Sequence, residues 1–404
     1  MADQVFKAVP VTDHVYWVGA VDWAIRDFHG YATSRGTSYN AFLIVDEEVI
    51  LVDTVKAPFR DEMLRRIASV VDPTSIRYII SNHSEMDHSG CLPDVIERVK
   101  PDAVFASGKG TEALARHFGL TDVEAVADGT AMTLGGADLH FLETRMLHWP
   151  DSMFTYYAND QVLFSSDAFG MHLASTQRFT DEMPWDVVRH ECAKYYANIL
   201  LPFSKLVLKL ADRLGELDLP LKVIACDHGP IWREGLDRIV ELYVQWATQA
   251  PTRKAVVVYD TMWGSTAAMA QAVAEGLVAG GAWAKVLPMG ANHRSDVATE
   301  LLDAGALVVG TPTLNRHMFP TLADVLTYLE GLAPKNLVGG AFGSYGWSSK
   351  AVGQVTEALK SMGVDTVAEP VESAYVPDEE VLARCHELGR AVAERLGAAC
   401  ESGA

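Results

Sequence analysis

The second half of this chain alternates strand-like runs with helical ones, a pattern that few folds can accommodate. Five apolar runs are separated by helical segments of about 10–18 residues. Strands connected through helices pair in parallel, because a parallel connection must cross the face of the sheet. We therefore predict an α/β unit with a doubly wound, parallel, five-stranded sheet. The predicted strands are Ala255–Tyr259, Ala284–Pro288, Ala306–Gly310, Val338–Gly343 and Thr366–Pro370.

The first half has a different rhythm, in which strands follow each other through tight turns. Two pairs of apolar runs flank the polar turns Asp46-Glu47-Glu48 and Asn159-Asp160 and predict hairpins. The paired runs are residues 40–45 with 49–53, and residues 154–157 with 161–165.

Helical patterns accompany these hairpins, and the rhythm changes at Ala250-Pro251-Thr252. We therefore predict two domains, residues 1–250 and residues 251–404, the first built of sheets covered by helices. Its predicted helices are residues 61–71, 110–118 and 186–217, the last divided at Pro202.

Composition and charge restrict the class of protein. Hydrophobic residues make up 49% and charged residues 21%, as in globular domains. There is no uninterrupted apolar run of about 18 residues that could cross a bilayer, and the start of the chain lacks the pattern of an export signal. The net charge of −20 repels nucleic acid and anionic membranes, so we expect neither as a partner.

The cysteines are scattered and form no C-x-x-C pair. This spacing argues against a disulfide framework, a rubredoxin-type centre or an iron–sulfur cluster within the chain. A reducing, cytoplasmic location is the expectation. The five cysteines are Cys91, Cys192, Cys226, Cys385 and Cys400.

A dense group of candidate metal ligands follows the apolar run at residues 78–80. His83, Glu85, Asp87 and His88 fall within six residues at the predicted end of a buried strand. Such a strand end can direct imidazoles and carboxylates into one pocket. Because a carboxylate is a harder ligand than an imidazole, Glu85 favours iron or manganese over zinc.

Three more candidate ligands repeat the same arrangement, an apolar run followed by one ligand. They are His148, Asp167 and His228, the last followed by a Gly-Pro turn. Each alone is an ordinary residue, but their recurrence at strand ends predicts one metal pocket.

A hydroxyl-rich loop follows the first strand of the second half. The side chains of Thr261, Ser265 and Thr266 and the backbone N–H groups of the following helix suit a phosphate monoester. The loop has neither the Lys of a Walker A loop nor the glycines of a dinucleotide fingerprint. On its own it is also compatible with an ordinary helix cap.

Two later loops also follow strands of this sheet, and ligands bind such sheets at the carboxyl ends of strands. Aromatic side chains in these loops could flank an isoalloxazine ring. The loops also resemble the FMN-binding loops of flavodoxins, and this resemblance implies noncovalently bound FMN. The candidate FMN residues are Thr261, Met262, Trp263, Gly264, Ser265, Thr266, Pro312, Thr313, Leu314, Asn315, Ser344, Tyr345, Gly346 and Trp347.

These motifs together resemble the flavodiiron proteins, or A-type flavoproteins, over nearly the whole chain. Residues 1–250 resemble their metallo-β-lactamase-like domain, and residues 254–400 their flavodoxin-like domain. The resemblance implies an αββα sandwich, an FMN and two iron ions. It also implies that His83, Glu85 and His148 bind one iron, that Asp87, His88 and His228 bind the other, and that Asp167 bridges them. In the wider fold, an aspartate at the position of Asp53 orients a ligand imidazole, although Asp53 could equally be a turn residue.

Weaker signals surround this pocket. By the same resemblance, His29 and Tyr196 are candidate catalytic residues that could donate hydrogen bonds to a bound diatomic gas. An aromatic core with a satisfied histidine explains them equally well, and His172 is similarly ambiguous.

Three functions remain open from the sequence. The resemblance favours an oxidoreductase that passes electrons from FMN to a diiron site and reduces dioxygen to water or nitric oxide to nitrous oxide. The alternatives are a hydrolase with an appended flavodoxin domain and a pure electron carrier. A separate donor, such as rubredoxin or a reduced deazaflavin, is expected to supply the electrons. The resemblance also implies a head-to-tail homodimer, or a dimer of dimers, with Trp347 near the contact.

Overall fold

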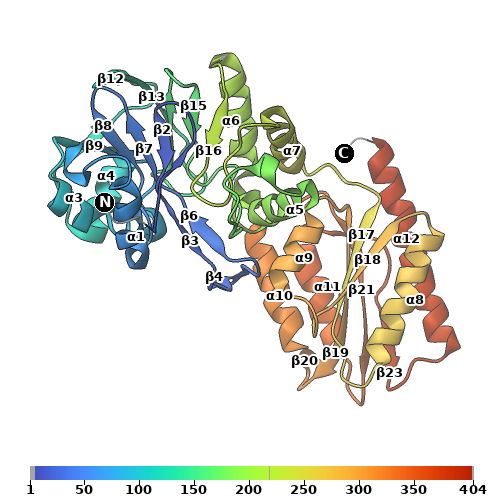
Figure 1. Cartoon of the computed structure of the whole chain (residues 1–404). Helices are drawn as coiled ribbons and strands as arrows, with labels where there is room; N and C mark the ends of the chain where they lie inside the picture. The colour runs from blue at the N-terminus through green and yellow to red at the C-terminus, as the bar shows by residue number, and fades with distance from the viewer. Residues whose placement is uncertain (1–4, 218, 403–404) are drawn as a thin grey trace. The chain divides into compact units, whose positions relative to one another are not determined.

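The computed structural model describes residues 5–217 and 219–402, which form two compact units (Figure 1). The first unit holds residues up to His29, Thr33–Tyr195 and Lys205–Val244. The second holds Gly30–Ala32, Tyr196–Ser204 and the chain from Gln245 onward. The sequence patterns do not predict the two short segments that the first half of the chain contributes to the second unit.

Two sheets form the centre of the first unit. A seven-stranded sheet has the order β1-β2-β7-β8-β9-β10-β11, and a five-stranded sheet has the order β12-β13-β14-β15-β16. The first contains Val9–Pro10 (β1), Val15–Trp17 (β2), Phe42–Val45 (β7), Val49–Val52 (β8), Ile76–Ser81 (β9), Ala103–Ser107 (β10) and Val123–Val126 (β11). The second contains Ala131–Leu134 (β12), Ala137–Glu143 (β13), Met153–Tyr157 (β14), Val162–Phe164 (β15) and Val223–Ala225 (β16). Four short strands lie outside both sheets: Ala20–Asp22 (β3), Asp27–Phe28 (β4), Tyr31–Ala32 (β5) and Thr37–Tyr39 (β6).

Both predicted hairpins are confirmed. β7 pairs with β8, and β14 with β15, in antiparallel register. Phe42 of the first sheet packs in one buried cluster with Phe141 and Phe164 of the second. On the other face of the first sheet, Leu51 packs with Leu114. The helices on that face are Arg60–Ile67 (α1), Leu92–Val99 (α3) and Gly108–Phe118 (α4), so the unit is the predicted layered sandwich.

The long helical pattern near residues 186–217 is divided in the structure, as Pro202 predicts, but over more residues. Proline lacks the N–H that an α-helix requires, and the turns around it change type. The order is Trp185–Tyr195 (α5), a π-helical turn at Tyr196–Leu200, a 3₁₀ turn at Leu201–Phe203 and Ser204–Leu217 (α6). The remaining α-helices described in the first half are Met86–Ser89 (α2) and Leu236–Thr248 (α7).

The second unit is the predicted parallel sheet. Its order β18-β17-β19-β21-β22 places the first strand between the second and third, and every neighbour on this path is parallel. Helices α8 and α12 cover one face, and α9, α10 and α11 cover the other (Figure 1). The strands are Lys254–Tyr259 (β17), Trp283–Pro288 (β18), Ala306–Leu314 (β19), His317–Met318 (β20), Val338–Tyr345 (β21), Asp365–Thr366 (β22) and Val371–Ala374 (β23). The helices are Ser265–Ala279 (α8), Arg294–Leu301 (α9), Pro320–Leu332 (α10), Ala351–Ser361 (α11) and Glu379–Ser402 (α12).

The fifth strand corrects one expectation. A continuous strand was expected at residues 366–370, but the structure has two pieces there, β22 and β23. Both pair with β21, in which Gly339 pairs with Thr366 and Phe342 pairs with Val371. Four residues of the fifth strand therefore lie opposite only two residues of β21. Pro370 has no N–H to donate, which explains why pairing lapses before Val371. Among the described residues, no helix combines the length and apolarity needed to cross a membrane.

Candidate functional site

Seven candidate ligands from separate strand ends meet in the first unit. His83, Glu85, His148 and Asp167 form one group, in which all four ligand atoms lie within 4.8 Å of each other. Asp87, His88 and His228 form a second group within the same limit. They follow the ends of four strands, β9, β13, β15 and β16. The structure thus brings together all seven residues named from the sequence.

Asp167 lies between the two groups. Its Oδ2 atom is 3.1 Å from Nε2 of His148 and 3.4 Å from Nε2 of His83. Its Oδ1 atom is 3.4 Å from Nε2 of His88 and 3.5 Å from Nε2 of His228. One oxygen therefore faces the imidazoles of one group, and the other oxygen faces those of the second. This is the arrangement that a carboxylate bridging two metal ions requires.

The residues fit a pair of cations. Both carboxylate oxygens of Asp87 and of Asp167, and both ring nitrogens of His88, are buried and have no hydrogen-bond partner among the described residues. Buried polar atoms without partners are costly, and metal coordination satisfies them. Mixed imidazole and carboxylate donors suit iron, as the sequence predicts.

The charges in the pocket point the same way. Burial opposes the charge on Glu85, but the imidazoles of His148 and His83 hold the pKa of its carboxyl group at about 2. Burial also opposes protonation of His88, yet the carboxylate of Asp87 and other carboxylates raise its pKa to about 10. Without a metal, the carboxylates thus favour protonated, positively charged imidazoles. Bound metal ions would supply that positive charge instead, with the imidazoles as neutral ligands.

Groups behind the ligands hold two of the imidazoles. Nδ1 of His83 lies 3.2 Å from Oδ2 of Asp151, which also accepts a hydrogen bond from the backbone N–H of Ser84 at 2.6 Å. Nδ1 of His228 donates to the carbonyl of Ser38 at 2.7 Å. Such contacts set which ring nitrogen faces the metal.

No role was predicted from the sequence for Asp151 or Asp227, whose carboxylates lie behind ligand imidazoles. Asp151 lies three residues after His148, and Asp227 immediately precedes His228, so their neighbourhood was the only available signal. Oδ2 of Asp227 is 3.8 Å from Nδ1 of His88, too far for a hydrogen bond.

Asp53 does not take the role suggested for it. Its carboxylate accepts hydrogen bonds from the backbone and the side chain of Asn82, at 2.7 and 2.8 Å. It therefore ties β8 to the segment that leads into the ligand cluster, rather than hydrogen bonding to an imidazole.

Of the two candidate catalytic residues, His29 lies beside the ligand cluster and Tyr196 does not. Nε2 of the exposed His29 is 3.7 Å from Oε1 of Glu85, at the edge of the cluster. Tyr196 packs against Trp246 with ring centroids 5.5 Å apart, and its hydroxyl lies 3.2 Å from that of Ser204, in the second unit.

Tyr195, the residue before Tyr196, lies beside the ligand cluster. The ring of Tyr195 is 5.1 Å from that of His172 and 6.0 Å from that of His228. Because α5 ends at Tyr195 and a π-helical turn begins at Tyr196, the two side chains belong to different units. The structure therefore places Tyr195, and not the predicted Tyr196, beside the ligand cluster. His172 is buried within 4.7 Å of the ring of His228, with its Nδ1 2.9 Å from the hydroxyl of Thr37.

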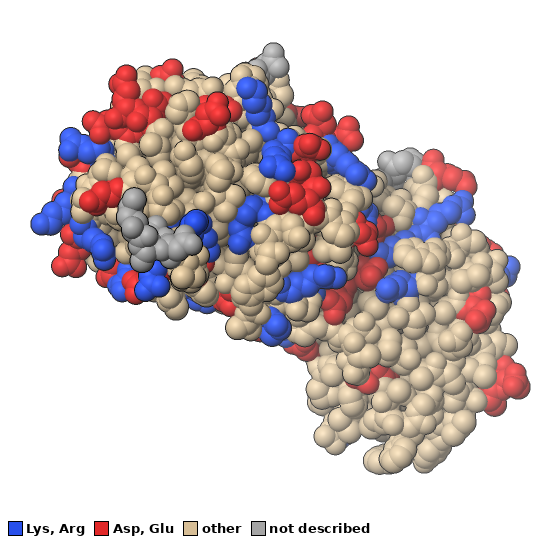
Figure 2. Space-filling view, in the orientation of Figure 1, with Lys and Arg blue, Asp and Glu red and all other residues tan. Residues whose placement is uncertain are grey.

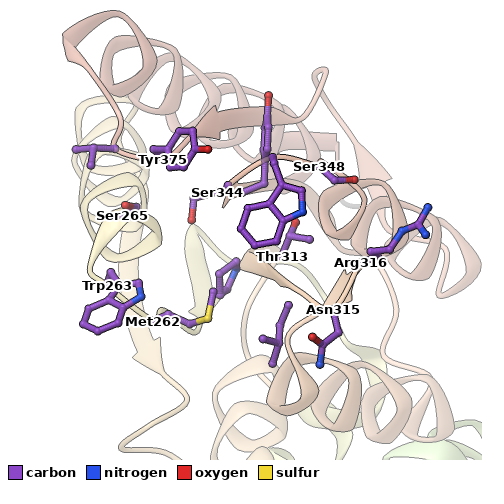
Figure 3. Close-up of a pocket in the computed structure, with 15 residues that line it drawn as sticks. Met262, Trp263, Ser265, Thr313, Asn315, Arg316, Ser344, Ser348 and Tyr375 are labelled. Carbon is purple, nitrogen blue, oxygen red and sulfur yellow. The ribbon is translucent and has the colours of Figure 1, made fainter.

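The second unit contains a cavity of about 540 Å³ at the strand ends (Figure 3). Eleven of the fourteen candidate FMN residues line it. Trp263 and Met262 lie on one side of the opening, across from Asn315 and Arg316 (Figure 3). Four lining residues were not identified from the sequence: Arg316, Ser348, Tyr375 and Val376.

Three candidates support the loops without lining this cavity: Thr261, Gly264 and Thr266. The hydroxyl of Thr261 accepts a hydrogen bond from the N–H of Gly264 at 3.1 Å. The hydroxyls of Thr266 and Ser344 are 2.9 Å apart, which links the first loop to the third.

Comparison with known proteins decides the family. The "ODP family beta lactamase" model matches residues 37–229, and the flavodoxin model matches residues 257–389. A nitric oxide reductase from Moorella thermoacetica is 46% identical over 96% of this chain and 99% of its own length. The solved flavodiiron protein from Giardia intestinalis has a TM-score of 0.95 and 34% identity, with each chain covered completely. The chain belongs to the flavodiiron protein family.

Other relatives agree with this membership. A rubredoxin-oxygen oxidoreductase from Megalodesulfovibrio gigas is 42% identical, covering 97% of this chain and all of its own. A solved rubredoxin oxygen:oxidoreductase from Desulfovibrio gigas has a TM-score of 0.95 and 40% identity, over 97% of this chain and 99% of that one. The flavodiiron fold class is confirmed, and the chain is an oxidoreductase rather than a hydrolase with an appended flavodoxin domain.

Proposed function

We propose that this flavodiiron protein reduces dioxygen to water or nitric oxide to nitrous oxide at two iron ions, with electrons supplied through FMN. The observation that carries the proposal is the placement of the two oxygens of Asp167, each facing a different group of imidazoles. A paired site can hold one small molecule between two metals. The names of relatives, a nitric oxide reductase and a rubredoxin-oxygen oxidoreductase, support both substrates.

The ligand roles follow the two groups of atoms. One iron would be held by His83, Glu85 and His148 and the other by Asp87, His88 and His228, and Asp167 would be shared between them. When bound, the irons and the FMN supply the electrons for the reduction. The protein holds the ligands in place by burial and by contacts such as that between Asp151 and His83.

His29 and the hydroxyl of Tyr195 are the proposed hydrogen-bond donors to the substrate. Nε2 of His29 lies 3.7 Å from Oε1 of the ligand Glu85, and its side chain is open to solvent. Tyr195 lies on the buried side, against His172 and His228. Hydrogen-bond donors beside the ligands would orient the substrate and pass on the protons that its reduction consumes.

The FMN is held at the cavity of the second unit. The hydroxyl-rich loop before α8, with Ser265 and the helix N-terminus, suits the phosphate, and the apolar walls suit the ring. Trp263 and Trp347 at its rim are 95% and 91% exposed, and the surface around the ends of β19 and β23 carries few charges (Figure 2).

An aromatic surface with few charges is characteristic of a surface that another protein covers. We propose that a second copy of the chain covers it in a head-to-tail homodimer, or in a dimer of such dimers. The FMN of one chain then faces the diiron site of the other. Closed two-fold pairing is the commonest form of oligomer.

The external donor is a small electron carrier, either rubredoxin, as the name of the Megalodesulfovibrio relative indicates, or a reduced deazaflavin. All five cysteines are free, which supports a reducing compartment, and we propose the cytoplasm.

The test combines cofactor analysis with rapid kinetics. We expect about one FMN and two irons per chain, and reoxidation of the fully reduced protein by dioxygen, nitric oxide or both in stopped-flow measurements. Zinc as the dominant metal, or a reduced protein inert to both gases, would overturn the proposal.

The dimer has its own test, a mixture of two inactive proteins. One carries Ser265→Ala and Thr266→Val and lacks FMN, and the other carries His88→Ala and lacks a metal ligand. Activity in the mixture after subunit exchange supports transfer between chains. An inactive mixture, in spite of exchange, contradicts the head-to-tail arrangement.

A further inference from the structure

We propose that Asn40 is a positioning residue for one iron, acting through the metal ligand His228. This inference rests on the proposed metal ligands. Asn40 lies between β6 and β7 and is only 1% exposed. Its backbone N–H donates to the carbonyl of Asp227, the residue before the ligand, at 2.8 Å.

The side-chain amide of Asn40 holds the backbone on both sides of His228. Its Nδ2 atom donates to the carbonyl of Cys226 at 2.6 Å and to that of Gly229 at 2.9 Å. Both of these partners are acceptors only, so the amide nitrogen must face them. A single buried group therefore spans the turn that carries the ligand.

The carbonyl oxygen of the same amide is also fully used. It accepts from Nε1 of Trp17 at 2.8 Å and from the hydroxyl of Ser38 at 2.9 Å. An indole N–H can only donate, which fixes the amide orientation independently. The guanidinium groups of Arg66 and Arg178 lie over the ring of Trp17, at 4.7 and 4.3 Å from its centroid.

Ser38 completes the support of the ligand. Its carbonyl accepts from Nδ1 of His228 at 2.7 Å, and its hydroxyl accepts from the N–H of Gly229 at 2.8 Å. Nδ1 therefore carries the proton, and Nε2 faces Asp87 at 3.2 Å. Ser38 thus fixes the orientation of the His228 imidazole, while Asn40 fixes the position of the backbone that carries it.

The other group of ligands has a different support. Its His83 is backed by Asp151, and neither residue takes part in the hydrogen bonds that Asn40 makes. Loss of the Asn40 amide should therefore loosen the iron held by Asp87, His88 and His228. The iron held by His83, Glu85 and His148 should stay.

The experiment uses the full chain with its FMN, in the variant Asn40→Asp. The carboxylate keeps the shape of the amide but cannot donate to the carbonyls of Cys226 and Gly229. We expect iron to fall from about two towards one per chain after dialysis against a chelator, with roughly 10–100-fold weaker binding of one ion. Mössbauer spectra of protein reconstituted with ⁵⁷Fe should lose one of the two iron signals, while the FMN content stays the same.

A second variant and a control guard against general destabilisation. Trp17→Phe removes the indole donor together with part of the buried ring, and should weaken the same iron by a smaller factor. This variant decides the question if Asn40→Asp does not fold. The control, Tyr157→Phe, deletes a hydrogen bond to Asp46 in the same unit and should keep both irons.

The outcomes separate this inference from the proposed function. Selective loss of one iron in the Asn40 and Trp17 variants supports the role of Asn40. Retention of both irons with wild-type affinity, or equal loss of both, overturns it and leaves the diiron assignment intact. A wild-type protein without bound iron would overturn the diiron assignment itself.

Discussion

The hydroxyl of Thr266 lies 2.9 Å from the hydroxyl of Ser344, and both side chains are buried at the base of the proposed FMN site. Thr266 is in the first turn of α8, and Ser344 is near the end of β21. This bond connects the start of α8 to the end of β21, two segments that are far apart in the sequence. It therefore fixes the spacing between the proposed phosphate loop and an aromatic loop.

Replacement of Thr266 by valine should weaken FMN binding about tenfold. Valine has nearly the same shape, but it leaves Ser344 without this partner, a loss of about 1–2 kcal/mol. Fluorescence titration of the apoprotein with FMN measures the change. The matched variant Thr356→Val, which removes a hydroxyl that bonds only within α11, should bind FMN as the wild type does. Equal affinity in the two variants would show that the link between the loops is unimportant.

Replacement of Glu85 by histidine should raise the zinc content and lower gas reduction. The change replaces an oxygen ligand by an imidazole in the group that contains His83 and His148. Nitrogen ligands shift the preference of such a site towards zinc. Metal analysis of protein expressed with both metals supplied, together with turnover, tests the expectation. Unchanged iron content and turnover would refute our explanation for the carboxylate at this position.

Replacement of Gly276 by alanine should destabilise the second unit by about 1–3 kcal/mol. A Cβ atom at this position would lie 1.9 Å from the carbonyl oxygen of His386, so α8 and α12 would have to move apart. The control is Gly353→Ala in α11, where a Cβ atom meets nothing within 4 Å. Alanine favours a helix over glycine, so the control should be neutral or slightly stabilising. Thermal unfolding followed by flavin fluorescence measures both, and equal melting temperatures would contradict the close packing.

The contact between His14 and Asp160 should make stability depend weakly on pH. Nδ1 of His14 lies 3.0 Å from Oδ1 of Asp160, and this hydrogen bond raises the pKa of the imidazole above its usual value. A pKa raised by folding adds stability that is complete below the unfolded-state pKa and is lost as pH rises through the folded-state pKa. His14 is 44% exposed, so the effect is below about 1 kcal/mol.

The measurement is urea unfolding of the wild type and of His14→Gln at acidic and alkaline pH. The wild type should gain stability relative to the variant near pH 5.5 and lose that advantage near pH 8.5. A difference that grows with pH would contradict the assignment.

The identity of the candidate ligands could be read from local sequence. Coordination chemistry depends on residue type. A metal pocket is predicted because four candidate ligands follow one buried strand: His83, Glu85, Asp87 and His88. The parallel sheet was equally accessible, since apolar periodicity and the alternation of strands and helices are local properties.

Other features depend on contacts between distant segments, which a local pattern does not contain. The orientation of Asp167 between two groups of imidazoles depends on several strand ends meeting. Whether Tyr195 or Tyr196 lies beside the ligands depends on the helical phase at the end of α5, where a π-helical turn begins. Asn40 reads as the start of a strand, yet its amide holds the turn around His228, nearly 190 residues away along the chain. Residue type determined which groups could bind metal, and tertiary packing decided which atoms face each other.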